Sequence, residues 1–177
     1  MKRGLYVTDD PVKKLVFSSM MAALTCVFTM VIHIPSPTNG FVNLGDGMVI
    51  LCGILLGPYY GGAAAGIGSA LADLLLSYPH YIPGTFLIKG GAAGLVSFIY
   101  HAASKKSAGA GKVKESLPVI FSGLGSLVVV VVGYFLYASI FLGKGVAAIS
   151  SIPGNIVQGI FGLIMALILM PLLKRVL

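Results

Sequence analysis

Residues 117–142 read LPVIFSGLGSLVVVVVGYFLYASIFL, and this run contains no charged side chain. A helix needs about 20 mostly apolar residues to cross the hydrocarbon core of a bilayer, and this run is longer. The whole chain of 177 residues has the same character, since 57% of it is apolar, 10% is charged and the mean hydropathy is +0.99. Soluble domains carry about 25% charged residues. The sequence therefore predicts one integral membrane domain over residues 1–177, with no room for a soluble catalytic or ATPase domain.

Proline and charged residues divide the chain into separate apolar runs, because proline lacks an N–H donor and interrupts helices. The second run is short and ends at Gly57 and Pro58, so we expect it to be tilted or to cross only part of the bilayer. The pattern predicts an all-α membrane protein of six transmembrane helices, at residues 12–34, 46–56, 60–77, 84–103, 117–142 and 153–173.

The basic residues predict the orientation of these spans, because cytoplasmic loops carry an excess of Lys and Arg. With six spans, three basic clusters fall on one side, which makes the N- and C-termini cytoplasmic. Basic residues at helix ends, rather than among aromatic residues on a polar face, do not indicate a nucleic-acid partner. The clusters are Lys2, Arg3, Lys13 and Lys14; Lys105, Lys106, Lys112 and Lys114; and Lys174 and Arg175.

Three charged side chains remain inside predicted spans: Asp46, Asp73 and Lys89. A charge at the bilayer centre costs about 2.5 to 3.5 kcal/mol on insertion scales, so such groups pair or face a cavity. Counting along the helices places Asp73 and Lys89 at similar depth near the outer ends of their spans. We expect the two to meet, either as a structural ion pair or as part of a ligand site. Asp46 is interpreted as a structural cap at the start of the second span.

Polar and aromatic side chains gather at the outer end of the predicted bundle. Amides on a membrane helix require hydrogen-bond partners, and polar groups under aromatic cover are typical of a small-molecule pocket. Contacts between helices and tyrosines at the membrane interface are the structural alternatives. No metal-ligand set is present, because Cys26 and Cys52 lie in apolar runs, and no Ser/His/Asp arrangement indicates an enzyme. The gathered residues are Asn39, Asn43, Tyr78, His80, Tyr81, Asn155 and Gln158.

Two strips of small residues allow close helix packing. The third span contains GGAAAGIGSALAD, residues 61–73, which we expect to pack inside the chain. The first span carries a second strip that faces either another helix of this chain or another protein. This second strip consists of Ser18, Ser19, Ala22 and Ala23.

The segments NLGD, LLGPYYG, GSALADLL, YPHYIP and TFLIKG follow one another within residues 42–91, and IPGNIVQG opens the last span. In this order they resemble the substrate-binding S component of an energy-coupling factor (ECF) vitamin transporter, in the branch assigned to hydroxymethylpyrimidine or pyridoxine. The resemblance covers nearly the whole chain, including the six spans and the strip on the first helix.

This resemblance implies a protein of the bacterial plasma membrane that captures a small heteroaromatic vitamin or precursor from outside. It implies a transmembrane T component and two ATPase subunits as partners, with ATP used by the partners and no cofactor in this chain. The strip at Ser18, Ser19, Ala22 and Ala23 matches the family's docking surface, with serine in place of the first alanine of each pair. The implied substrate contacts are Asn43, Asp73, Tyr78, His80, Tyr81, Lys89, Tyr134, Tyr137, Asn155 and Gln158.

Other functions are compatible with parts of this pattern. A stand-alone transporter would use Asp73 and Lys89 as a proton relay and would need no ATPase partner. An S component for another vitamin, such as riboflavin, folate or pantothenate, would share the fold. A membrane enzyme is the least favoured class, because paired catalytic carboxylates or a nucleophile with its base do not occur together.

Overall fold

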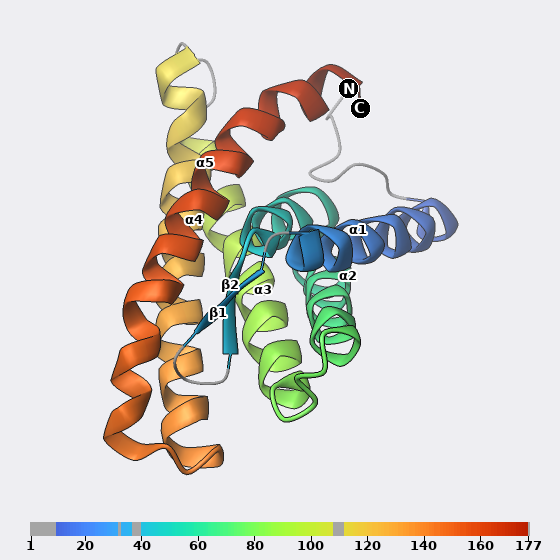
Figure 1. Cartoon of the computed structure of the whole chain (residues 1–177). Helices are drawn as coiled ribbons and strands as arrows, with labels where there is room; N and C mark the ends of the chain where they lie inside the picture. The colour runs from blue at the N-terminus through green and yellow to red at the C-terminus, as the bar shows by residue number, and fades with distance from the viewer. Residues whose placement is uncertain (1–9, 32, 37–39, 108–111, 177) are drawn as a thin grey trace.

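The computed structural model describes residues 10–31, 33–36, 40–107 and 112–176 (Figure 1). These residues form an almost entirely helical structure, which confirms the predicted all-α class apart from one short antiparallel ribbon. The elements in chain order are α1 (Pro11–Val31), β1 (His33–Ser36), β2 (Gly40–Asn43), α2 (Gly45–Leu75), α3 (Ile82–Ser107), α4 (Lys112–Leu136), the π-helix η1 (Tyr137–Phe141), the 3-10 helix η2 (Gly145–Ser151) and α5 (Ile152–Val176).

Helix α2 contains both the second and the third predicted spans, joined by a kink at Gly57. Gly57 has φ 86° and ψ −179°, a backbone region essentially restricted to glycine, and Pro58 disfavours a helical residue before it. The bend is sharp, because a Cβ added at Gly61 would lie 2.7 Å from the carbonyl carbon of Cys52. The predicted break at Gly57 and Pro58 is therefore confirmed.

The predicted number of six spans is not confirmed. Within the described ranges, five helices are long and apolar enough to cross a membrane: α1, α2, α3, α4 with η1, and α5 with η2. The first half of α2, residues 45–56, is about 18 Å long at 1.5 Å per residue, which is shorter than the ~30 Å hydrocarbon core. The prediction of a short second span was right about length, but this segment is continuous with the third.

Helix α1 begins close to the predicted position but ends earlier than predicted. Asp10 accepts hydrogen bonds from the backbone N–H groups of Val12 (2.9 Å) and Lys13 (3.3 Å), and so caps a helix that begins at Pro11. The helix ends at Val31 rather than at the predicted residue 34. Residues 33–36 instead pair with residues 40–43 as an antiparallel ribbon, with His33 opposite Asn43.

Glycine contacts fix how α2 packs against its neighbours. A Cβ on Gly62 would lie 3.1 Å from the carbonyl oxygen of Gly90 in α3, and a Cβ on Gly90 would lie 3.1 Å from that of Gly62. On another face of α2, a Cβ on Gly68 would meet Thr25 Cβ of α1 at 2.8 Å. The small residues of the third predicted span are thus used inside the chain, as expected.

Helices α4 and α5 run side by side, and α1 packs against α2 in a different direction (Figure 1). The first half of α2 lies between α3 and α5, because a Cβ at Gly53 would meet Val96 at 3.0 Å and one at Gly47 would meet the Gly162 carbonyl oxygen at 3.1 Å. Large apolar side chains are exposed on the outer faces of α1, α4 and α5, for example Leu15, Val128 and Ile168. Such faces are covered by lipid in a membrane protein.

The predicted cytoplasmic placement of both termini is not tested by this arrangement. Lys2 and Arg3 lie outside the described residues, as does Asn39 of the predicted polar end. The orientation therefore stays a prediction.

Candidate functional site

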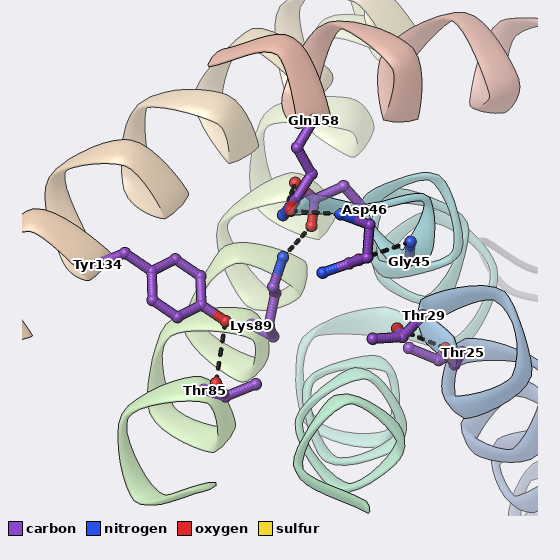
Figure 2. Close-up of polar contacts among 9 residues, drawn as sticks. Thr25, Thr29, Gly45, Asp46, Thr85, Lys89, Tyr134 and Gln158 are labelled. Carbon is purple, nitrogen blue, oxygen red and sulfur yellow. Dashed lines mark hydrogen bonds and ion pairs between the residues drawn. The ribbon is translucent and has the colours of Figure 1, made fainter. Parts of the chain in front are cut away.

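A buried polar network joins the start of α2 to α3 and α5 (Figure 2). The Asp46 carboxylate forms an ion pair with the Lys89 ammonium through Oδ1 and accepts a hydrogen bond from Gln158 Nε2 through Oδ2 (2.9 Å). The Asn43 backbone N–H donates to Gln158 Oε1 (2.9 Å), and Asn43 Oδ1 accepts from the Gly45 N–H (2.8 Å). Lys89 and Gln158 are only 2% and 1% exposed. The network therefore holds two opposite charges and an amide away from the surface.

Two predictions about these charges were wrong. Asp46 is not a helix cap, because Leu44 occupies the cap position without a side-chain hydrogen bond and the Asp46 carboxylate bonds Lys89 and Gln158. Lys89 forms its ion pair with Asp46 rather than with Asp73. The reason is the kink at Gly57, which places the first half of α2 against both α3 and α5. The depths expected from the sequence were counted along straight helices, so they did not include this bend.

The Lys89 side chain also faces an aromatic ring. Its Nζ lies 5.4 Å from the centroid of the Tyr134 ring, a distance at which a cation is attracted to the ring face. The Tyr134 hydroxyl in turn lies 3.0 Å from Thr85 Oγ1 (Figure 2). An ammonium has three N–H donors, and the hydrogen bond formed by Lys89 within the described structure goes to Asp46. Lys89 thus has donor capacity for a further acceptor.

Asp73 lies beside this network, as expected, although it is not the ion-pair partner of Lys89. It is 3% exposed, near enough to Thr85 for a side-chain hydrogen bond and near enough to Lys89 for their charges to interact. Its Oδ2 atom is buried with no hydrogen-bond partner among the described atoms, and the same holds for Ser69 Oγ. The three charges predicted from the sequence therefore occupy one region.

An aromatic group adjoins the polar network at one side. The ring centroid of Tyr81 lies 6.2 Å from that of Tyr134 and 6.1 Å from that of Tyr137, and 4.9 Å from that of His80. Tyr81 is buried, and its hydroxyl accepts a hydrogen bond from Lys144 Nζ (3.1 Å). Tyr134 and Tyr137, two of the implied substrate contacts, thus lie next to Tyr81 of the predicted outer loop.

The remaining predicted residues lie at the edges of this arrangement. Tyr78 is half-buried and His80 is exposed, with their ring centroids 6.1 Å apart. The Tyr137 hydroxyl donates to the His80 carbonyl oxygen (2.9 Å), which ties η1 to the loop before α3. Asn155 is buried three residues before Gln158, so the two share a face of α5.

Sequence reasoning missed Ser69, Thr85 and Lys144. Thr85 precedes Lys89 by four residues, so both lie on one face of α3, and this spacing was a signal for it. Ser69 stands in the same relation to Asp73 on α2, but it was interpreted only as a small packing residue. Lys144 lies outside the three basic clusters, and nothing in the sequence around it indicates its contact with Tyr81.

The docking strip of α1 divides into two halves. Ser18 is buried and its hydroxyl donates to the Lys14 carbonyl oxygen (2.7 Å), and Ala22 lies against Gly68 of α2. Ser19 and Ala23 are exposed. The structure uses Ser18 and Ala22 internally, so only Ser19 and Ala23 remain available to another protein.

Comparisons with known proteins show what this chain is similar to. Residues 10–175 match the family model described as "ECF-type riboflavin transporter, S component". An uncharacterised protein encoded in a gap 3' region of Pyrococcus woesei is 36% identical over 139 residues, which covers 78% of this chain and 86% of the relative. The thiamine precursor transporter HmpT of Lactococcus lactis subsp. cremoris is 29% identical over 169 residues, covering 93% of this chain and 89% of the relative.

A solved structure of the S component of a bacterial ECF transporter has the same fold. It matches with a TM-score of 0.65 at 21% sequence identity and covers 94% of this chain and 98% of that chain. The family is one of transporter components and not of enzymes, and its members are multi-pass membrane proteins, in agreement with the five candidate spanning helices. On the match over residues 10–175, this chain belongs to the family of ECF-type transporter S components.

Proposed function

We propose that this chain captures a small heteroaromatic vitamin or vitamin precursor, of the hydroxymethylpyrimidine or pyridoxine type, from outside the cell. The observation that carries the proposal is the convergence of Asp46, Asp73, Lys89 and Gln158, which are all buried in one region beside Tyr134. A chain that needs only to fold in lipid has little reason to bury two carboxylates and an ammonium, because each charge is costly there.

A flat heteroaromatic ring suits this set of groups. Tyrosine faces stack on aromatic rings, while the amides, carboxylates and ammonium form hydrogen bonds with the nitrogen and oxygen atoms of the ligand. Lys89 would donate to a ligand oxygen or nitrogen, with Asp46 rather than Asp73 holding it in place. The proposed contacts are Asn43, Asp73, Tyr78, His80, Tyr81, Lys89, Tyr134, Tyr137, Asn155 and Gln158.

The names of the similar proteins and of the matching family model point to different ligands. HmpT, at 29% identity, is named a thiamine precursor transporter, whereas the description of the matching family model names riboflavin. The YPHYIP and TFLIKG segments resemble the hydroxymethylpyrimidine or pyridoxine branch, which favours a vitamin precursor over riboflavin. Riboflavin, folate and pantothenate are the alternatives that a binding panel must include.

Delivery of the ligand would depend on other subunits. Membership in the family supports a transmembrane T component and two ATPases as partners, with ATP hydrolysed by those ATPases. The exposed pair Ser19 and Ala23 on α1 is the proposed contact with the T component. Ser18 and Ala22 take no direct part in this contact, because Ser18 is buried and Ala22 packs against Gly68 of α2.

The test is purification of the chain from membranes, followed by mass spectrometry of any small molecule that purifies with it. We expect a pyrimidine or pyridine vitamin precursor in about equal molar amount. Another vitamin would keep the capture function and overturn the ligand assignment. Uptake into vesicles that contain this chain alone, driven by a proton gradient, would overturn the S-component mechanism in favour of a stand-alone transporter.

A further inference from the structure

Two buried oxygen atoms stand out because the described part of the protein leaves them without hydrogen-bond partners. They are Ser69 Oγ and Asp73 Oδ2, on residues that are 1% and 3% exposed. Buried polar side-chain atoms are bonded in the great majority of cases, since an unbonded one has lost its water without replacement. In the folded chain these two atoms therefore carry unused hydrogen-bonding capacity at a real free-energy cost.

Both atoms belong to one face of α2, the face that packs against α3. Gly62 and Gly66, on the preceding turns of this face, lie against the Gly90 and Phe86 carbonyl oxygens of α3. Ser69 and Asp73 continue the same row at helical spacing, four residues apart, so their Cβ atoms are about 6 Å from each other. The row leads from the close helix contact toward the polar region.

The surroundings of Asp73 connect this pair to the proposed ligand site. The carboxyl of Asp73 lies close to Thr85 and Lys89, and its charge also reaches the Tyr134 hydroxyl. The Thr85 hydroxyl is bonded to that of Tyr134 (3.0 Å), and Lys89 is paired with Asp46. Thr85, Tyr134, Lys89 and Asp46 thus have partners among themselves, whereas Asp73 Oδ2 has no hydrogen-bond partner in the described structure.

We infer that Asp73 Oδ2 and Ser69 Oγ bind the edge of a ligand that carries an amino group next to an unprotonated ring nitrogen. The inference rests on the proposed function and names the chemistry that its site selects. A carboxylate oxygen accepts a hydrogen bond from the amino group, and the serine hydroxyl donates one to the ring nitrogen. A 4-aminopyrimidine has this edge, with donor and acceptor on adjacent positions.

The same pair of atoms disfavours an oxo ring. A 4-oxopyrimidine presents a carbonyl oxygen where the amino group stands, so two acceptors face each other at Asp73 Oδ2. A site that hydrogen-bonds a substrate group rejects an analogue lacking it, because its buried polar atoms are then unpaired. Asp73 and Ser69 are therefore specificity-determining residues, while Lys89 and the tyrosines contact the rest of the ring.

The test is isothermal titration calorimetry of the purified full chain with 4-amino-5-hydroxymethyl-2-methylpyrimidine and with its 4-oxo analogue. We expect the wild-type chain to prefer the amino compound by at least about tenfold. Asp73→Asn weakens its binding by about ten- to hundredfold, and Ser69→Ala by about tenfold, because a hydrogen bond to a charged group is stronger than one to a neutral group. In Asp73→Asn the preference over the oxo compound falls toward unity, whereas Ser69→Ala keeps most of this preference, because the two acceptors meet at Asp73 Oδ2.

A matched control is Ser122→Ala, an equally buried serine on α4 whose hydroxyl donates to the Val119 carbonyl oxygen (3.1 Å). It lies twelve residues before Tyr134, about 18 Å along the helix, and the binding of both compounds is expected to be unchanged. Ligand-free Ser69→Ala is expected to unfold at the wild-type temperature or above, because it deletes an unpaired buried group. A clear loss of stability there would show an internal partner for Ser69 and contradict the inference.

The outcomes separate this inference from the proposed function. If the wild-type chain binds the amino compound and folded Asp73→Asn and Ser69→Ala bind it equally well, the inference is overturned and the capture function stands. If the wild-type chain binds neither compound, the pyrimidine assignment fails and the inference fails with it. Should Asp73→Asn not fold, Ser69→Ala decides alone, and unchanged affinity in it overturns the inference.

Discussion

At the scale of single residues, Lys89 and Asp46 depend on each other. Replacing Lys89 by methionine keeps an unbranched side chain, one atom shorter, but leaves the Asp46 carboxylate buried without its counter-ion. Removing one partner of a buried pair costs about 3 to 5 kcal/mol. We expect Lys89→Met to lower the free energy of unfolding in detergent by that amount, measured by denaturant or thermal unfolding.

The control is the double variant Asp46→Leu with Lys89→Met. An apolar replacement of both members of a buried pair is often close to neutral, so the double variant should recover most of the lost stability. Asp46→Leu also removes an acceptor of Gln158 Nε2, so recovery is expected to be incomplete. A double variant that is less stable than Lys89→Met alone would show that the pair is not the main interaction of Lys89.

The cost of polar groups in lipid explains which residues could be found from the sequence. For this reason five polar residues in the predicted spans were expected to be buried, and all five are: Asp46, Asp73, Lys89, Asn155 and Gln158. The sequence could not assign their partners, because pairing depends on how helices are placed around one another. The predicted partner of Lys89 was therefore wrong, although the prediction that Lys89 needs a partner is confirmed.

At the scale of elements, the kink in α2 depends on one glycine. Gly57 has φ 86° and ψ −179°, where any side chain is strained. We expect Gly57→Ala to reduce the free energy of unfolding by about 1 to 3 kcal/mol and to weaken ligand binding, since the kink places Asp46 beside Lys89. Unfolding and calorimetry of the same preparation check both effects. Wild-type stability in this variant would contradict the described backbone at Gly57.

The contact between α2 and α5 is a second element-scale test. A Cβ at Gly162 would lie 2.6 Å from Asp46 Cβ and 2.8 Å from the Gly47 backbone nitrogen. Gly162→Ala should therefore force α5 away from Asp46 and cost about 1 to 3 kcal/mol. Gly91→Ala on α3 is the control, because nothing lies within 4 Å of its Cβ position, and it should be neutral or gain up to about 1 kcal/mol. Equal unfolding temperatures for the two variants would argue against this helix contact.

Helix positions were largely predictable from the sequence, whereas the connections were not. Apolar runs bounded by proline marked all the long helices and the break at Gly57. The ribbon of β1 and β2 was missed, since Ile34 belongs to the apolar run of α1 and its pairing with Val42 involves residues on the far side of a turn. The π-helix η1 was interpreted as ordinary helix, because a change of hydrogen-bond register leaves no mark in hydropathy.

At the scale of the whole molecule, the exposed half of the α1 strip predicts how the chain meets its proposed T component. Ala23→Trp adds a bulky side chain at an exposed position without disturbing the contact of Ala22 with Gly68. We expect ligand binding by the isolated chain to be unchanged and ATP-driven uptake in vesicles with the T component and ATPases to fall at least about tenfold, since close helix contact needs small residues. Phe98→Trp, at an exposed position of α3, is the control and should leave uptake unchanged. Normal uptake by Ala23→Trp would exclude this face of α1.

Equilibrium binding to the purified chain measures whether the buried polar network holds a small molecule. Calorimetric titration should cover pyrimidine and pyridine precursors, riboflavin, folate and pantothenate, with wild type, Gln158→Ala and Ser122→Ala. We predict one ligand bound per wild-type chain, binding at least about tenfold weaker in Gln158→Ala because Asp46 and Asn43 lose their shared partner, and wild-type affinity in Ser122→Ala. No binding by the wild-type chain across the panel, or equal affinity in Gln158→Ala, would show that the network does not hold a ligand.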